Sequence, residues 1–161
     1  MTGELAVAGT SDNIPARATA AIDIADRKFD FGDTITRDWM ETSFGIIVPE
    51  VASRDEIQSL MLDFLRGWDI FSRGLLHHHK KALRSMGRGE WRIVMPQDQA
   101  TYALEKTQGD ISRAISTGRR IVQNTRTDLL SDAERSAHRD AEGRIAALNA
   151  LQRRVLPTHG K

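Results

Sequence analysis

Three consecutive histidines, His77, His78 and His79, and the aspartate pair Asp30 and Asp33 are the side chains whose types suggest metal binding or acid–base catalysis. Successive residues on a helix point about 100° apart, so the histidines cannot converge on one ion, which typically requires i, i+4 spacing. Aspartates that flank a turn are common because they bond turn backbone. The chain has no cysteine, which excludes thiolate metal sites, disulfides and cysteine nucleophiles. We therefore expect no metal site, no cofactor and no enzymatic activity.

A row of basic residues suggests a different chemistry, the neutralisation of phosphate groups. On a continuous helix these residues lie within about 100° of arc and span about 27 Å, and they are Arg66, Arg73, His77, Lys80, Lys81 and Arg84. Arg88 and Arg92 follow at a glycine turn and strand. Release of counterions from nucleic acid would supply salt-dependent affinity to this basic row. Two alternatives remain open: a solvated helix face and a surface for an acidic protein partner.

The charge distribution suggests that one end of the chain binds a polyanion and the other end does not. The 161 residues carry a net charge of +1, but residues 1–50 carry −5, residues 51–100 carry +2 and residues 101–161 carry +4. Hydrophobic residues at 40% and charged residues at 28% are typical of a folded globular protein. No apolar run approaches the roughly 18 residues that span a bilayer, and the N-terminus does not resemble a secretory signal. We expect a cytoplasmic protein with no membrane partner.

The residue pattern in the first third of the chain predicts a tail, a small hairpin and a helix. Residues 1–20 show no periodicity and are expected to form a flexible tail. Alternation of apolar residues predicts two strands within 21–31. A helix over 35–44, capped by Thr34 or Thr36 and ended by Gly45, is predicted next, followed by a brief strand over 46–48.

The central segment carries the clearest helical pattern. Ser53 and Glu56 form a capping-box motif, and downstream apolar residues share one narrow face of a helix, namely Ile57, Met61, Phe64, Trp68, Phe71, Leu75, His78, Ala82 and Met86. Gly67 and Gly74 each disfavour a helix by about 1 kcal/mol relative to alanine. Whether 54–86 forms one helix or two therefore stays open.

The last third is predicted to be helical. A short helix over 97–107 ends at Gly109, a second begins at Asp110, and a capping box of Ser131 and Glu134 opens a third. We expect the last two helices to pack as an antiparallel hairpin that forms a homodimer through residues 110–156.

The segment GRGEWRIVMP resembles the wing of winged-helix DNA-binding domains such as those of response regulators. In that family a glycine–x–glycine–aromatic–arginine–apolar hairpin follows the recognition helix, and the matching positions are Gly87, Gly89, Trp91, Arg92, Ile93 and Val94. Glu90 is an insertion relative to this pattern. The resemblance covers residues 33–96 and implies that a helix over 72–86 enters the major groove, while Arg88 and Arg92 approach phosphate or the minor groove.

The sequence thus predicts a mainly α fold with a small β component: a tail over 1–20, a winged-helix-like domain over 21–96 and a C-terminal helical region over 97–161. The expected function is non-enzymatic binding of double-stranded DNA in regulation of transcription or replication, in a protein encoded by a phage or mobile element. The alternative is a protein-interaction module or inhibitor that docks on a larger nucleic-acid-handling complex.

Overall fold

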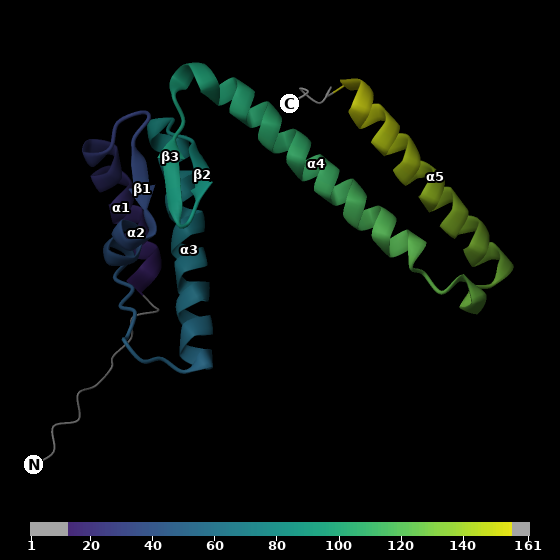
Figure 1. The fold of residues 1–161 in the computed structure, drawn as a ribbon, viewed down its shortest axis with the longest axis horizontal. Helices are drawn as coiled ribbons and strands as arrows, with labels where there is room; N and C mark the ends of the chain where they lie inside the picture. Colours follow the sequence, from purple (N-terminus) through teal and green to yellow (C-terminus); the bar gives the residue numbers. More distant parts are fainter. Residues whose placement is uncertain (1–12, 156–161) are drawn as a thin grey trace, which may run out of the picture. The chain divides into compact units, whose positions relative to one another are not determined.

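The computed structural model describes residues 13–155, which form two compact units that divide between Gln99 and Ala100 (Figure 1). Unit 1 contains the helices α1 (Ile14–Lys28), α2 (Arg37–Phe44) and α3 (Arg54–His79) and the strands β1 (Thr34–Thr36), β2 (Leu83–Gly87) and β3 (Glu90–Ile93). Unit 2 contains α4 (Gln99–Gln123), except for the first residue of that helix, and α5 (Asp132–Val155). The described chain is mainly helical with a small antiparallel sheet, as predicted. None of its helices is long and apolar enough to cross a membrane.

Helix α1 replaces the predicted hairpin over 21–31 and the end of the predicted tail. Proline at the first turn and many alanines favour a helix, and Ala18, Ala21 and Ala25 line its buried side. The alternation of Ile22 and Ile24 suggested a strand, but Ile22 is buried and Ile24 is half exposed. The strand prediction was wrong because helix propensity and a small-residue packing face outweigh two alternating pairs. The prediction of a tail over 1–12 lies outside the described residues.

Helix α3 is one helix, and its glycines are packing positions. A Cβ at Gly67 would lie 2.7 Å from the ring of Phe44, and a Cβ at Gly74 would lie 2.1 Å from Cδ1 of Ile22. The two glycines therefore let α2 and α1 approach α3 closely. The predicted capping box is present: Ser53 N–H donates to Oε2 of Glu56 at 2.7 Å, and Glu56 N–H donates to Oγ of Ser53 at 3.3 Å. Hydrogen bonds to the Glu56 carboxylate from the backbone N–H of Ser53 and from its side chain lower the pKa of Glu56.

Helix α2 ends as predicted, but its neighbours differ from the prediction. Thr36 caps it, with Trp39 N–H donating to Thr36 Oγ1 at 3.3 Å. Gly45 closes it in the left-handed conformation at φ 73°. Ile35 lies in β1 instead of the helix and is fully buried. Residues 46–48 form no strand; Ile46 is buried, whereas Ile47 and Val48 are exposed.

The sheet has the order β1–β3–β2, with both pairs antiparallel. Trp91 and Ile93 of the central strand β3 face the helices, and the ring of Trp91 lies 4.6 Å from that of Trp68. The buried core joins this inner side to the three helices, with Ile35, Met40, Phe44, Phe64, Phe71, Leu75 and Ile93 among its members. Strands β2 and β3 form a hairpin where the sequence resembles a wing, at the segment that contains Gly87, Gly89, Trp91 and Ile93.

Unit 2 is a hairpin of two long antiparallel helices (Figure 1). Gly109 does not end a helix, because α4 runs through it; the predicted break between 97–107 and 110 was wrong. Nothing lies within 4 Å of a Cβ built at Gly109. Helix α5 begins at the predicted capping box, with Ser131 N–H donating to Glu134 Oε2 at 2.8 Å. Across the hairpin, Gln152 Nε2 donates to Ser112 Oγ and to the Gln108 carbonyl.

Candidate nucleic-acid interface

The basic row predicted along a continuous helix is divided in the structure. Helix α3 ends at His79, and Lys80 adopts the left-handed conformation at φ 58°, so residues 80–86 are not helical. Lys80 Nζ donates to the His77 carbonyl at 2.8 Å. The prediction of an unbroken row from Arg66 to Arg84, and of a recognition helix over 72–86, was therefore wrong, because the last turn of α3 closes before the row is complete.

Lys81 is buried and does not belong to an exposed basic surface. Its side chain is 7% exposed, and its Nζ lies 2.7 Å from Oδ1 of Asp26. The same ammonium donates to the carbonyls of Asp26 and Phe29 at 2.9 Å each, at the end of α1. The hydrogen bond from Lys81 lowers the pKa of Asp26. The prediction that Lys81 lies on the exposed basic row was wrong, since its side chain is buried and its charge joins α1 to the segment that leads into β2.

Arg66, Arg73 and His77 are exposed on α3. Arg73 forms an ion pair with Asp69 one turn earlier, with Nε 3.1 Å from Oδ1. The first turns of α3 add acidic residues, Asp55 and Glu56. The helix thus presents separate cations rather than a continuous basic line.

Three other arginines of the prediction gather on the β2–β3 hairpin. Arg84 of β2 and Arg92 of β3 are direct cross-strand partners, and Thr34 of β1 pairs with Arg92 from the other side. Because side chains alternate across a sheet and Trp91 faces α3, both arginines point to the opposite side, which we name the outer sheet face: Thr34, Thr36, Arg84, Glu90 and Arg92. Arg88 is exposed at the turn.

The turn of this hairpin has a defined conformation. Arg88 and Gly89, between the paired residues Gly87 and Glu90, have φ values of 54° and 76°, as a two-residue type I′ loop requires. Gly89 is also held from α2, because Arg37 N–H donates to its carbonyl at 2.8 Å. The guanidinium of Arg37 lies 4.6 Å from the ring centre of Phe64. No local sequence pattern indicates this contact, since Arg37 and Gly89 are 52 positions apart.

Among the histidines and aspartates considered for chemistry, His79 and Asp33 have structural partners. His79 lies between two carboxylates of α1, with Nε2 3.2 Å from Asp23 and Nδ1 3.1 Å from Asp26. Asp33 accepts the backbone N–H of Asp30 at 2.8 Å and so shapes the turn before β1. Within residues 13–155 no group of three or more His, Cys, Asp or Glu side chains could hold a metal ion.

An exposed apolar cluster is a surface that the sequence patterns did not reveal. Ile57 and Met61 were expected on the buried stripe, yet they are half exposed. The cluster covers the segment before α3 and the first half of α3, and we define it as Ile47, Val48, Val51, Ile57, Met61, Leu62 and Leu65. Val51 is 90% exposed and Leu62 is 61% exposed. Large exposed apolar patches mark interaction sites.

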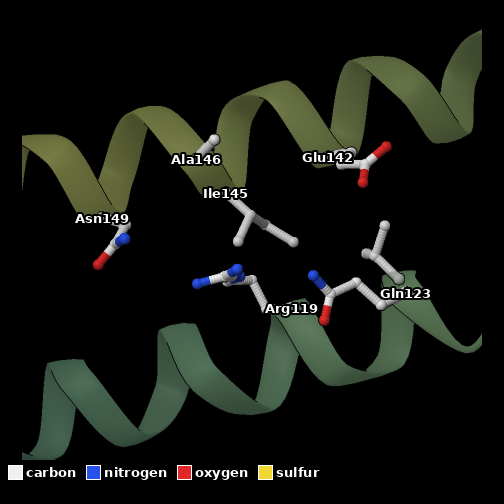
Figure 2. Close-up of a pocket in the computed structure, with 7 residues that line it drawn as sticks. Arg119, Gln123, Glu142, Ile145, Ala146 and Asn149 are labelled. Carbon is white, nitrogen blue, oxygen red and sulfur yellow. The ribbon is translucent and has the colours of Figure 1, made fainter.

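Unit 2 carries a polar pocket of about 280 Å³ between α4 and α5. Figure 2 shows Arg119 and Gln123 of α4 opposite Glu142 and Asn149 of α5, with Ile145 between them. The lining contains one basic and one acidic side chain, Arg119 and Glu142, so the pocket carries no net charge that would favour phosphate.

Comparisons of this chain with models of protein families, with curated proteins and with solved structures find no match.

Proposed function

We propose that the chain is a non-enzymatic DNA-binding protein that acts in regulation of transcription or replication, and that unit 1 is a winged-helix domain whose wing is the β2–β3 hairpin. The succession of α2, α3, β2 and β3, with a glycine turn between the strands, agrees with the resemblance of GRGEWRIV to a wing. Arg84, Arg88 and Arg92 are the proposed wing contacts.

The observation that carries this proposal is the cross-strand pair of Arg84 and Arg92. Like charges directly opposite each other on a sheet are destabilising, and Arg88 adds a third cation at the tip. Glu90 is the acidic side chain on the same face, so the hairpin keeps a net positive charge of two. Guanidinium groups suit bidentate phosphate binding, so the hairpin offers three arginines on one short segment to the phosphate groups of a nucleic acid.

The test is fluorescence anisotropy of a labelled random duplex of about 30 base pairs, titrated at salt concentrations from about 50 to 300 mM. We expect wild-type affinity to fall steeply with salt. The variant Arg84→Gln with Arg92→Gln should lower the log–log slope by about 1.8, since each lost phosphate contact contributes about 0.9.

A matched control removes the same two charges elsewhere, as Arg27→Gln with Arg144→Gln, both exposed. Its slope should stay close to the wild-type slope. If the control and the hairpin variant lose affinity equally, the binding is unspecific attraction to a basic chain and the wing proposal fails. Absence of wild-type binding at about 50 mM salt would contradict DNA binding altogether.

The exposed apolar cluster favours a second candidate function, a protein-interaction module that docks on a nucleic-acid-handling complex. Its residues lie beside Asp55 and Glu56, whose charges disfavour phosphate. The variant Met61→Gln with Leu65→Gln should abolish retention of such a complex in a pull-down and leave duplex binding intact. The opposite pattern, with retention lost only in the Arg84 and Arg92 variant, would contradict this candidate.

A further inference from the structure

Unit 2 has no buried core of its own. Helices α4 and α5 contain no buried residue, and large aliphatic side chains remain exposed on both, including Leu104, Ile111, Ile121, Leu148, Leu151 and Val155. A helix pair that buries so little apolar surface does not offset the conformational entropy lost on ordering about 50 residues. The apolar side chains therefore need a partner surface.

The exposed aliphatic side chains gather on one side of the hairpin. A mostly apolar groove of about 380 Å³ is lined by residues of which none is charged, namely Ile111, Ala114, Ile115, Leu148, Leu151, Gln152 and Val155. On helical wheels at 100° per residue, Ile145 and Gln152 face α4, Leu151 and Val155 lie on one side of them, and Glu142 lies on the other. The polar pocket of Figure 2 therefore lies on the opposite side of the hairpin.

We propose that this apolar side binds the same side of a second copy of the chain, so that two hairpins form a four-helix bundle. A two-fold dimer brings each residue of a patch against the same patch. No charged residue lines the groove, so two grooves that meet bring no like charges together within them. The two pockets of the polar side contain Arg119, Arg135 and Arg139 but one acidic residue, Glu142, so two copies meeting there would bring an excess of positive charge together.

The area of one whole side of the hairpin, with the groove and the charged Arg144 that lies on the same face of α5, matches what a stable dimer needs. Helix α5 has 24 residues, which gives a length of about 36 Å. Two packed helices are about 19 Å wide, since axes lie about 9 Å apart and each helix is about 10 Å across. One side of the hairpin therefore offers roughly 700 Å² per copy, or about 1,400 Å² in total, within the range of about 1,200–2,000 Å² for specific interfaces.

The first test is the molar mass of the full chain by light scattering at several concentrations. The chain weighs 18.0 kDa, so the dimer weighs twice that. The variant Leu148→Glu with Leu151→Glu should give the monomer mass, whereas the control Gln123→Glu with Ala146→Glu, on the polar side, should stay dimeric. A wild-type monomer at the highest concentration, or a dimer in both variants, would overturn the proposal.

Chemical cross-linking keeps the proposal testable if the charged variant loses its helices. The chain has no cysteine, so Leu151→Cys introduces one thiol on the apolar side and Gln123→Cys one on the polar side. With a flexible bis-maleimide, Leu151→Cys should yield the covalent dimer and Gln123→Cys should not. Cross-linking of Gln123→Cys alone would overturn the proposed side. The inference does not depend on DNA binding, because neither measurement contains DNA.

Discussion

The ammonium of Lys81 lies 2.7 Å from the carboxylate of Asp26, across 55 positions of sequence. Lys81 also donates to two carbonyls at the end of α1, which otherwise have no partner inside the helix. One buried cation thus both caps α1 and holds the segment that leads from α3 into the sheet. This contact removes Lys81 from the basic row and gives it a structural role.

Replacement of Lys81 should therefore change stability and leave DNA binding unchanged. In Lys81→Met the part-buried carbonyls of Asp26 and Phe29 lose this donor, which costs about 1–3 kcal/mol of unfolding free energy. Urea unfolding followed by tryptophan fluorescence measures this, because all three tryptophans, Trp39, Trp68 and Trp91, lie in unit 1. The exposed Lys80→Met is the control and should stay within about 0.5 kcal/mol of wild type. A reduced salt slope in folded Lys81→Met would show that Lys81 does contact phosphate.

Acid should weaken unit 1 through Asp26. The hydrogen bond from Lys81, with the charges of Lys81, His79 and Arg27, lowers the pKa of Asp26 below its unfolded value, which is about 3.9. The unfolded carboxylate therefore takes up protons first as pH falls. The stability that Asp26 contributes is present above the unfolded pKa and is lost as pH falls through it toward the folded value.

Urea midpoints measured from about pH 6 to about pH 3 test this dependence. Asp26→Asn should be less stable than wild type at the upper end, and the difference should shrink toward the lower end. Asp38→Asn, at an exposed position of α2, is the control. A constant difference between Asp26→Asn and wild type across the range would contradict the linkage.

Removal of Arg92 should raise stability while it weakens DNA binding. Arg92→Gln relieves the repulsion from Arg84 directly opposite, which contributes about 0.2–1 kcal/mol, and it removes one proposed phosphate contact. Arg88→Gln is the matched change, because Arg88 lies at the turn with no cross-strand partner; it should weaken binding without the gain in stability. Thermal unfolding and anisotropy together measure both effects. A loss of stability in Arg92→Gln would show that Arg92 has a structural role.

Glycine-to-alanine changes in α3 and in α4 should change the free energy of unfolding in opposite directions. In Gly67→Ala the new methyl group meets the ring of the buried Phe44, and overpacking of a core costs about 1–3 kcal/mol. In Gly109→Ala the methyl group meets open space, so the helix gains about 1 kcal/mol from propensity. Urea unfolding followed by circular dichroism compares them. Equal gains in both variants would contradict the close packing of α2 on α3.

Local features of the fold were predictable because their causes are local. The capping boxes of Ser53 with Glu56 and of Ser131 with Glu134 satisfy helix donors within one turn. Gly45 ends α2 because a left-handed residue closes the helix without side-chain strain. The pattern of Trp91, Arg92 and Ile93 predicts a strand, and its partner β2 lies a two-residue loop away.

The candidate site was predictable only in part, since a helical wheel assumes that the helix continues. Arg84, Arg88 and Arg92 remain together because they lie on one hairpin. Lys80 and Lys81 do not continue the basic row of α3, because that helix ends at His79. The backbone N–H of Arg37 donates to the carbonyl of Gly89 in the turn, and no local pattern encodes this contact over 52 positions.

The sequence by itself determined the mainly helical class, the capped starts of α3 and α5, the end of α2 at Gly45 and the β2–β3 hairpin, because propensity, capping and turn conformation act over a few residues. Only the tertiary structure decided that 14–28 is a helix, that Gly67 and Gly74 are contact positions, and that Lys81 is buried against Asp26. Each of these depends on which distant surface packs on the residue, and burial of apolar and charged groups against such surfaces outweighs the weaker local preferences.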